Sequence, residues 1–593
     1  MRAGSVALEH RLRVTFAILF LALMALLVRA GYLQIFKSRQ ISERARNQHL
    51  DRVEIDAPRG RILDRNGRIL TASFRGVTVA VNPQRVSDPE RFASAVAFTL
   101  KETDAASEFA EGLAAMKRAG KRYYLLRRGV DRDLAARLRA ARLDGLDLRE
   151  EGRRVHPHGR AGIQLLGLYG GDGDPRKRRG LSGLEAWFEQ RLRGQPGQKP
   201  VVMLLRRTED GIRRERHVLE PDRARAPTPG TDVRTTIDLT LQQIVEEALD
   251  DLQARFLPVR SCAIAMDPRS GEILALAGRP ALDPTRVPNV PRESLKVQAV
   301  EWCYEPGSTI KPLIMAAALA EGAVRPGQEI DCGPGYRQFG WRRVHDVRPN
   351  GVLSLEDVLV KSSNIGMAQV SLALGSPRAH AFLTRLGFGR KTGISMPGES
   401  AGRLFPLDRW RDNDILLSVG FGYAVSVTPV QLVRAYSALV NGGLLYPPTL
   451  VRGATSAPPV ELDLSRFERE FVRDAMVRVV AEGTGRRARV PGMRVGGKTG
   501  TTKKYPLESN RYVASFIAFA PADDPQIVLL VAADEPKRKG NTPYGGYVAA
   551  PYVGQILRRA KPLLDAQRKE TLTKSGVRHQ KIQAELVRVA AVR

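Results

Sequence analysis

The sequence has little cysteine and little histidine. Its 593 residues include three cysteines, which are too few for a disulfide framework, and the odd number leaves at least one of them unpaired. The eight histidines are scattered, and neither they nor the cysteines have the spacing of metal ligands. These absences argue against a disulfide-stapled protein and against a metal-dependent one.

Acidic residues are also in short supply. The 63 Asp and Glu residues face 94 Lys and Arg residues, which gives a formal net charge of +31. Such a charge suits contact with nucleic acid, an anionic membrane or an acidic polymer. The basic residues are spread along the chain without any motif of a nucleic-acid-binding protein, so a solvated, arginine-rich surface explains them better.

Long hydrophobic runs are rare, with one stretch near the start as the exception. After the short basic segment 1–13, residues 14–36 form an apolar pattern that reaches about 34 Å as a helix, enough to cross a bilayer. A cleaved signal peptide is the alternative, because the uninterrupted apolar run is short. No clean cleavage site follows, which favours an uncleaved anchor, and the nearly balanced flanking charges do not orient it.

Residues 37–232 are typical of an irregular, non-catalytic α/β module. A hairpin is expected around Asn66-Gly67, helices over 89–119 and 131–143 with a short strand between them, and a second hairpin at Asp210-Gly211. Pro and Gly then mark a linker. We expect a pedestal that acts as a spacer or docking surface.

Residues 233–565 are expected to form an α/β domain, with a sheet built from both ends of the segment and helices between them. The chain is therefore predicted to be an α+β multidomain protein with a single transmembrane helix, a pedestal and a sheet flanked by helices. The basic tail 566–593 has no predicted role.

The chemistry is expected at Glu305-Pro306-Gly307-Ser308-Thr309-Ile310-Lys311. Pro-Gly marks a turn and the Ala-rich run after it favours a helix, so Ser308 should lie at a helix start with Lys311 on the same face. A serine hydroxyl needs a neighbouring base to become a nucleophile, and a buried lysine can lose its charge and act as that base.

Two further motifs follow in order, Ser362-Ser363-Asn364 and Lys498-Thr499-Gly500-Thr501. A second Lys-Thr-Gly occurs at Lys391, within a loop rich in Gly and Pro, whereas Lys498 lies among paired strand patterns. The motif must lie on an edge strand that faces the serine, so we assign Lys498 to the site and regard Lys391 as coincidence.

Ser-x-x-Lys, Ser-x-Asn and Lys-Thr-Gly in this order are typical of penicillin-binding proteins and serine β-lactamases. From residue 10 to about 565 the chain resembles a class B penicillin-binding protein. The resemblance also rests on the anchor and on further matching stretches, namely Arg59-Gly60, Asp64-Arg65-Asn66-Gly67, Ser182-Gly183-Leu184-Glu185, Gly420-Phe421-Gly422, Thr428-Pro429-Val430-Gln431, Tyr544-Gly545-Gly546 and Ala549-Ala550-Pro551.

The resemblance implies the roles of the site residues. Ser308 would attack the penultimate D-alanine carbonyl of a donor stem peptide, and Lys311 would take its proton. Ser362 would pass the proton toward the leaving amine, and Lys498 would tune that network. Asn364 would bind the substrate backbone, the N–H groups of Ser308 and Thr501 would form an oxyanion hole, and the Thr499-Gly500-Thr501 segment would hold the substrate carboxylate.

The same resemblance implies a serine D-Ala-D-Ala transpeptidase that needs no metal or organic cofactor and is inhibited by β-lactams. It would be anchored in the bacterial inner membrane with its catalytic domain on the outer side, working with a membrane-embedded glycan polymerase and division-complex membrane proteins, not with nucleic acid. Glu305 and the Ser362–Gly366 stretch favour septal synthesis. An elongation-type transpeptidase remains the alternative, and a membrane-bound β-lactam hydrolase or sensor is less favoured.

Overall fold

The computed structural model describes residues 2–37, 50–170, 178–208, 211–218, 224–282, 291–410, 413–453, 457–538, 540 and 542–569. The chain forms two compact units, one from Met1–Pro58 and Arg193–Gly230 and the other from Arg59–Leu192 and Thr231–Arg593. The domain boundaries expected from the sequence remain predictions, and most of the basic tail lies outside the described residues.

The first unit begins with the expected apolar helix. Helix α1 (Arg2–Gly31) continues into a π-helical turn (Tyr32–Phe36), and residues Arg13–Ile35 have a mean hydropathy of 2.3. Among the described residues, this helix alone is long and apolar enough to cross a membrane. It is consistent with membrane anchoring, because an apolar helix of this length leaves no backbone polar group unsatisfied in a bilayer.

A three-stranded antiparallel sheet completes the first unit, in the order β1 (Leu50–Ile55), β8 (Gly197–Thr208) and β9 (Gly211–Val218). The pairing of Thr208 with Gly211 shows that β8 and β9 form the second expected hairpin, although Asp210 of its turn lies outside the described residues. Strand β1 pairs with β8 across more than 140 residues of sequence, so this sheet could not be read from local patterns.

The second unit opens with the first expected hairpin, between β2 (Ile62–Leu63) and β3 (Ile69–Val81). Its turn is organised by Asp64, whose buried carboxylate accepts hydrogen bonds from the backbone N–H groups of Asn66 and Arg68, both at 2.8 Å. Gly67 has a φ of +89°, which a residue with a side chain rarely adopts. The Asn-Gly signal therefore marks the turn correctly.

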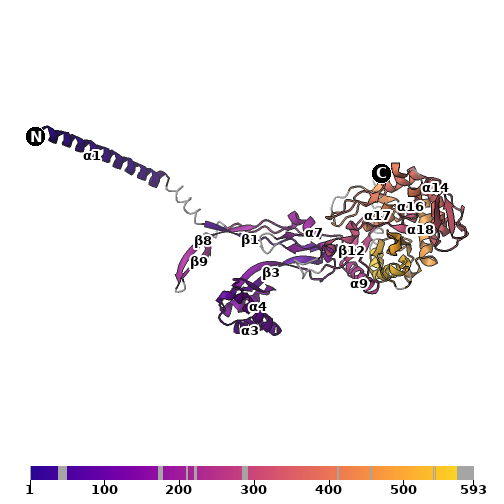
Figure 1. Cartoon of the computed structure of the whole chain (residues 1–593), viewed down its shortest axis with the longest axis horizontal. Coiled ribbons are helices and arrows are strands. Elements are labelled where there is room, and N and C mark those ends of the chain that lie inside the picture. Colours follow the sequence, from indigo (N-terminus) through magenta and orange to yellow (C-terminus); the bar gives the residue numbers. More distant parts are fainter. Residues whose placement is uncertain are drawn as a thin grey trace, which may run out of the picture. The chain divides into compact units, whose positions relative to one another are not determined.

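Strand β3 is the centre of a small α/β layer (Figure 1). It pairs with β4 (Tyr124–Val130) and β5 (Leu146–Val155) in a sheet that β2 and β10 (Val233–Arg234) extend. The helical stretch expected over 89–119 is interrupted at Lys101, which has a φ of +60°, and forms α3 (Pro89–Leu100) and α4 (Ala106–Arg118). The second expected helix is α5 (Arg132–Ala140), and all three pack on this sheet. Their apolar faces share one core with the strands, in which Val79, Val96, Leu113 and Leu138 are fully buried.

A buried ion cluster connects β5 to the segment that contains Glu185. The carboxylate of Glu185 is fully buried and accepts hydrogen bonds from Arg59 at 2.7 Å and from Arg154 at 2.6 Å. Arg59 also pairs with Glu189 at 2.7 Å and stacks over the ring of Tyr169. Glu185 belongs to the Ser-Gly-Leu-Glu stretch, so that stretch serves to neutralise buried arginines.

The catalytic region is built on a five-stranded antiparallel sheet in the order β12 (Ile273–Arg279), β11 (Arg260–Met266), β23 (Ile527–Asp534), β22 (Tyr512–Ala520) and β21 (Gly496–Lys503). Strands from both ends of the segment meet where β11 pairs with β23. The sheet is covered on both faces, so β12 and β23 are almost entirely apolar, whereas the edge strand β21 is rich in Gly, Thr and Lys. The expected sheet flanked by helices is confirmed.

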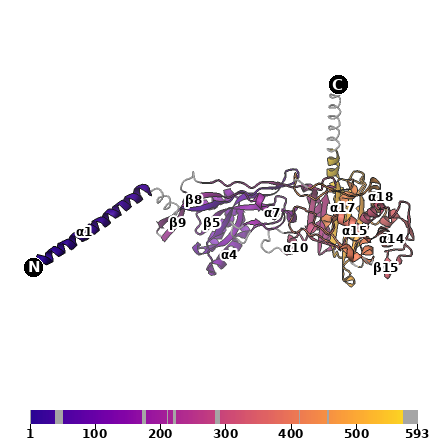
Figure 2. The same cartoon turned by 90° about the horizontal axis from the view of Figure 1, so that it is seen from above.

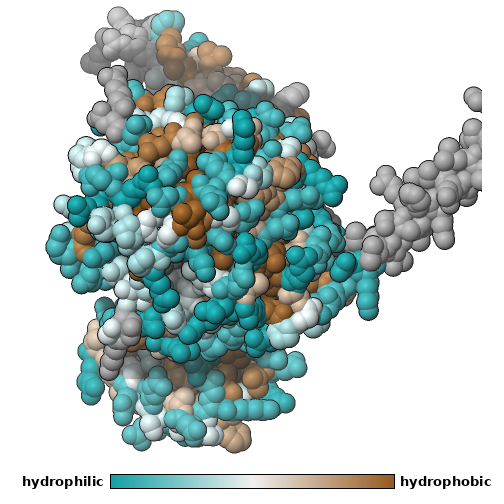
Figure 3. Space-filling view, turned by 90° about the vertical axis from the view of Figure 1, so that its right-hand side faces the viewer, coloured by the Kyte–Doolittle hydropathy of each residue, from teal (hydrophilic) through white to brown (hydrophobic). Residues whose placement is uncertain are grey.

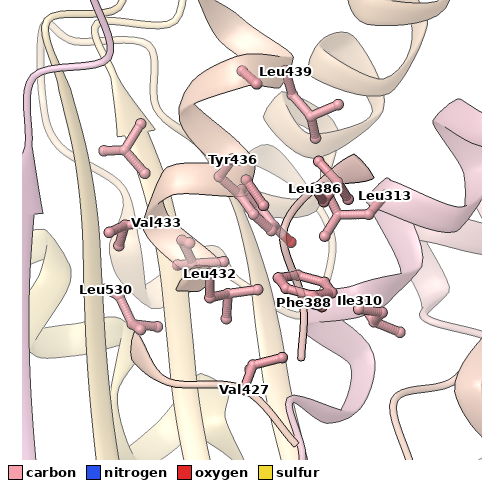
Figure 4. Packing of buried hydrophobic residues seen from close by; sticks show 14 of the residues in the cluster. Ile310, Leu313, Leu386, Phe388, Val427, Leu432, Val433, Tyr436, Leu439 and Leu530 are labelled. Atoms are coloured by element: carbon pink, nitrogen blue, oxygen red, sulfur yellow. The ribbon is translucent and has the colours of Figure 1, made fainter. Parts of the chain in front are cut away.

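Alternate side chains of these strands enter two different cores. On β23, Val528 and Leu530 face a large helical layer, whereas Leu529 and Val531 pack against α9 (Leu239–Phe256) and the C-terminal helical segment. Figure 4 shows Leu530 among buried side chains of α12 (Lys311–Ala320) and α17 (Pro429–Val440). Each such buried side chain stabilises the fold by about 1.5–3 kcal/mol.

The helices that lie between β12 and β21 in the sequence carry the first two motifs, and Figure 2 labels α14 (Asn364–Leu374), which begins at the second motif. Some of these helices start at side-chain caps, among them Ser354 before α13 and the capping box that Thr428 forms with Gln431 at α17. The surface seen in Figure 3 is largely hydrophilic, in keeping with the charge of the chain. The remaining elements of this layer are α13 (Leu355–Lys361), α14 (Asn364–Leu374), α15 (Ser376–Arg385), α16 (Asp414–Gly420), α18 (Arg466–Ala481), β13 (Glu329–Asp331), β14 (Tyr336–Phe339), β15 (Arg342–His345) and β16 (Val352–Ser354).

Candidate active site

Ser308 lies in a 3₁₀ turn (Gly307–Ile310) that runs directly into α12, as the Pro-Gly signal and the Ala-rich run predict. Gly307 holds this turn against its neighbours with a φ of +57°. A Cβ on Gly307 would lie 2.4 Å from the hydroxyl oxygen of Thr502, and its N–H donates to the carbonyl of Gly422 at 3.0 Å. The glycine therefore allows β21 to approach the serine.

Lys311 is fully buried one turn along from Ser308. Its amine contacts the Ser362 carbonyl at 2.7 Å, the Asn364 Oδ1 at 2.8 Å, the Ser363 carbonyl at 3.2 Å and the Ser362 hydroxyl at 3.3 Å. Burial lowers the pKa of Lys311 to about 7, against the opposing influence of the Asp346 carboxylate and the Cys332 thiol. The amine is therefore poised to exist in both protonation states near neutral pH.

The hydroxyl of Ser362 joins the two lysines of the site. Lys498 donates to it at 2.8 Å, and the amine of Lys311 lies 3.3 Å from it. Ser362 ends α13 with a φ of +59°, a strained conformation for a residue with a side chain. Lys498 is also fully buried, and burial together with the nearby Lys311 lowers its pKa well below that of an ordinary lysine. Two amines that share one hydroxyl can exchange protons through it.

Asn364 is held at the start of α14. Its Oδ1 accepts from Lys311, and its amide nitrogen donates to the carbonyl of His345 at 2.9 Å. The carboxylate of Asp346 accepts from the N–H of Asn364 at 2.5 Å, the N–H of Ile365 at 3.0 Å and the hydroxyl of Ser363 at 2.6 Å. Asp346 thus caps α14 and fixes the Ser-x-Asn segment.

Asp346 was not predicted as a site residue. It follows β15, outside every motif, and its contacts with residues 363–365 bridge about eighteen positions of sequence. Nothing in its own surroundings distinguishes it from a loop aspartate. A buried cysteine, Cys332, was also unassigned, and its sulfur lies 3.3 Å from the hydroxyl oxygen of Ser363.

The Lys-Thr-Gly motif lies on β21, the edge strand of the sheet, as expected for Lys498. Thr499 is nearly buried, and its hydroxyl pairs with that of Thr484 at 2.9 Å. A Cβ at Gly500 would meet the carbonyl of Pro306 at 2.9 Å, so this position accepts no side chain. The hydroxyl oxygen of Thr501 accepts from the N–H of Gly545 at 3.0 Å, which leaves its own hydrogen for another partner.

The second Lys-Thr-Gly lies in a loop, also as expected. Lys391 is exposed and outside any helix or strand. The following Thr392 and Gly393 are bound by Glu399, which accepts from the N–H of Thr392 at 2.6 Å and from the N–H of Gly393 at 3.1 Å. This copy of the motif shapes a turn and has none of the contacts that Lys498 makes.

The structure therefore joins Lys311, Ser362, Asn364 and Lys498 through hydrogen bonds and packs the Ser308 turn against β21. The described hydrogen bonds of the Lys311 amine run to the Ser362–Asn364 segment and do not include one to the Ser308 hydroxyl. Among the residues whose placement is described, no group of three or more His, Cys, Asp and Glu side chains could hold a metal ion.

Comparison with known proteins identifies two domains. Residues 261–558 match the penicillin binding protein transpeptidase domain, and residues 54–235 match the penicillin-binding protein dimerisation domain. In fold, the chain is similar to a crystal structure of a peptidoglycan synthetase from Bifidobacterium adolescentis, with a TM-score of 0.63 and 23% identity over 87% of this chain and 97% of that one.

Full-length relatives carry related names. The chain is 34% identical to Stage V sporulation protein D of Bacillus subtilis over 95% of its own length and 87% of the relative's. It is 31% identical to the probable peptidoglycan D,D-transpeptidase PbpC of Pseudomonas aeruginosa, with 93% and 94% covered, and 29% identical to the peptidoglycan D,D-transpeptidase FtsI of Escherichia coli K12, with 91% and 89% covered. The chain belongs to the class B penicillin-binding proteins and is a peptidoglycan D,D-transpeptidase.

Proposed function

We propose that this transpeptidase cross-links stem peptides through an acyl-enzyme on Ser308 and that it does so in septal cell-wall synthesis. The observation that carries the catalytic part is the convergence of Lys311 and Lys498 on the hydroxyl of Ser362, beside the turn that bears Ser308. Two buried amines with lowered pKa values have no structural purpose that uncharged side chains would not serve better.

Acylation starts with the neutral form of Lys311. The amine accepts the proton of Ser308, whose Oγ attacks the carbonyl carbon of the penultimate D-alanine of the donor. A pKa of about 7 keeps a substantial fraction of the amine neutral at physiological pH and makes its conjugate acid strong enough to return the proton. The N–H groups of Ser308 and Thr501 stabilise the oxyanion, at about 10²–10³ in rate for each donor.

The proton then travels to the departing amine. Ser362 lies between the two lysines and can accept a proton from Lys311 while it donates its own to the terminal D-alanine. The amine of Lys498 lies 2.8 Å from the same hydroxyl. It can orient the hydroxyl of Ser362 or give it a new proton. An acceptor amine from a second stem peptide enters by the reverse path and resolves the ester.

The substrate is expected to bind as an additional strand along the free edge of β21. An edge strand offers unpaired N–H and C=O groups, and an extended peptide can pair with them. Gly500 lets the strand lie against the carbonyl of Pro306 in the serine turn, while Thr499 and Thr501, beside Lys498, hold the terminal carboxylate. The side-chain amide of Asn364 binds the donor backbone.

The septal role rests on finer features. Glu305, before Pro-Gly-Ser-Thr, accepts from the N–H of Ala424 at 3.0 Å through its side chain, and its carbonyl accepts from the hydroxyl of Thr502 at 2.9 Å. It thus ties the serine turn to two neighbouring segments. Relatives named peptidoglycan D,D-transpeptidase FtsI and probable peptidoglycan D,D-transpeptidase PenA match 91% and 95% of the chain. Together with Glu305, the Ser362–Gly366 stretch resembles the division branch of the family.

The membrane helix is expected to hold the enzyme in the cytoplasmic membrane with its catalytic domain outside. Small residues such as Ala22, Ala25 and Gly31 allow close packing beside a membrane-embedded glycan polymerase, which the chain would need because cross-linking must keep pace with glycan synthesis. Residues 37–232 would serve as the pedestal and meet such partners, and residues 233–565 would form the transpeptidase domain.

Two experiments test these proposals. Purified protein given a D-Ala-D-Ala donor and an amine acceptor should release D-alanine and form the new amide, and Ser308→Ala should do neither. Depletion in cells should give chains or filaments with intact side walls. Rounded cells that still divide would assign the protein to elongation instead, and release of D-alanine without any amide product would indicate a hydrolase.

A further inference from the structure

A cation–π stack lies beside the Lys-Thr-Gly strand and has no part in the chemistry described above. The guanidinium carbons of Arg487 and Arg538 lie 4.0 and 4.1 Å from the centre of the Tyr547 ring. Two planar groups cannot share the space over one face of a ring, so the tyrosine is sandwiched between them. The two positive charges are therefore no more than about 8 Å apart.

No described carboxylate neutralises this pair. Within the described ranges, neither Arg487 nor Arg538 forms an ion pair, and the one hydrogen bond of the Arg538 guanidinium goes to the carbonyl of Thr542 at 3.1 Å. Arg487 and Tyr547 are exposed, the ring by 40%, and Arg538 is half-buried. Two adjacent cations that are open to solvent favour an anion between or beside them.

Two members of the stack, Arg487 and Tyr547, closely follow residues that contact Thr499 of β21. Tyr547 follows Gly546, where a Cβ would lie 2.5 Å from the carbonyl of Thr484 and 3.5 Å from the methyl of Thr499. Arg487 lies three residues after Thr484 in the sequence. The hydroxyl of Thr484 forms a hydrogen bond with that of Thr499 at 2.9 Å. The stack therefore lies next to the place where, in the proposed mechanism, the carboxylate of the departing D-alanine is held.

The acceptor stem peptide must bind where the departing D-alanine was bound. Its amine attacks the ester carbonyl from the position that the leaving amine vacated, because the second half-reaction reverses the geometry of the first. In this step the amide C–N bond forms, the ester bond to Ser308 breaks, and the amine proton returns to the serine oxygen. Substituents on the amine-bearing carbon of the acceptor then lie beside Thr499 and the stack.

We propose that Arg487 and Arg538, positioned by Tyr547, bind the carboxylate of the acceptor residue and so select acceptors that carry an acid next to the reacting amine. This proposal rests on the proposed transpeptidation. It adds a substrate preference that the three motifs do not supply, and because the leaving D-alanine occupies the same place, the stack also faces donors whose leaving group carries a carboxylate.

The test measures how the acyl-enzyme partitions between two acceptors. Full-length protein in detergent is acylated by a small ester donor and offered either D-alanine, which has the carboxylate, or D-alaninamide, which lacks it. Changing both arginines to glutamine (R487Q with R538Q) should lower kcat/KM for D-alanine by about tenfold or more and leave that for D-alaninamide unchanged. The single variants should show intermediate losses.

Arg486→Gln is the matched control, because Arg486 is exposed next to Arg487 and makes no contact with the ring. Acylation by an ester donor without a carboxylate on its leaving group, and the melting temperature, should be the same in every variant, which shows that the fold and the acylation step are intact. Equal losses for both acceptors, no loss at all, or the same effect from Arg486→Gln would overturn the proposal. If penicillin does not label the wild-type protein, the proposed function itself is refuted.

Discussion

The amine of Lys498 lies 2.8 Å from the hydroxyl of Ser362. This contact links the last motif to the second, and because the same hydroxyl lies 3.3 Å from the amine of Lys311, it links both to the first. The activity of a site assembled in this way depends on the protonation states of two buried lysines.

The rate of acylation should follow the titration of Lys311. Burial lowers its pKa to about 7, and only the neutral amine can accept the proton of Ser308. The rate of penicillin acylation should therefore increase with pH, reach half its plateau near pH 7, and fall about tenfold per unit below about pH 6. Stopped-flow or quench measurements between pH 5 and 9 would show this, and a flat profile would exclude Lys311 as the base.

Replacing Asp346 should move that profile. Its carboxylate raises the pKa of Lys311 against the effect of burial, so Asp346→Asn should shift the midpoint to lower pH. The variant also loses the charge that caps α14 and should be destabilised by about 1 kcal/mol. Asp463→Asn, at a nearly fully exposed position, is the control. An upward shift of the midpoint would show that the Asp346 carboxylate does not raise the pKa of Lys311.

The two copies of Lys-Thr-Gly should respond differently to alanine. Lys498→Ala should slow acylation by a factor of about 100 or more, because it removes the amine that contacts Ser362. Lys391→Ala should change stability by no more than about 0.5 kcal/mol and leave acylation unaltered, since that residue is exposed in a loop. Measured acylation rates in the reverse order would contradict the assignment of the edge strand.

The ion cluster around Glu185 should matter for stability and not for chemistry. Glu185→Ala leaves Arg59 and Arg154 buried without their shared carboxylate, at a cost of about 3–5 kcal/mol. Thermal unfolding followed by circular dichroism measures this loss. Removing the exposed ion pair between Arg61 and Asp232 should change the melting temperature little. Similar melting temperatures for both variants would show that the cluster is not structural.

The membrane helix should be dispensable for acylation and required for growth. A chain that begins after residue 40 lacks the apolar helix but keeps all three motifs, so it should be soluble and react with penicillin. Exported without its anchor, it should fail to replace the full chain. Normal growth with the unanchored form would show that the helix serves only for targeting.

Local signals predicted the parts of the fold that depend on neighbouring residues. Asn66-Gly67 marked a hairpin because a positive φ is needed there, and the surroundings of Lys391 and Lys498 separated a loop from a strand. The three motifs predicted residues that the structure brings together, because each motif places its polar side chains within a few positions.

Distant contacts were beyond such signals. Asp346 acts on residues 363–365, and the Arg487–Tyr547–Arg538 stack joins three segments that only the folded sheet brings together. Similarly, the hydrogen bonds of the Lys311 amine with the Ser362–Asn364 segment depend on the packing of α12 against α14, which helical spacing around Ser308 does not specify.

Covalent labelling by fluorescent penicillin tests the central assignment most directly. Wild-type protein and Ser308→Ala are incubated with the label, separated on a denaturing gel, and digested so that mass spectrometry locates the adduct. We expect a stable ester on Ser308 in the wild type and no labelling of the variant, which should unfold at a similar temperature. Labelling of Ser308→Ala at the wild-type level, or an adduct on another residue, would contradict the account.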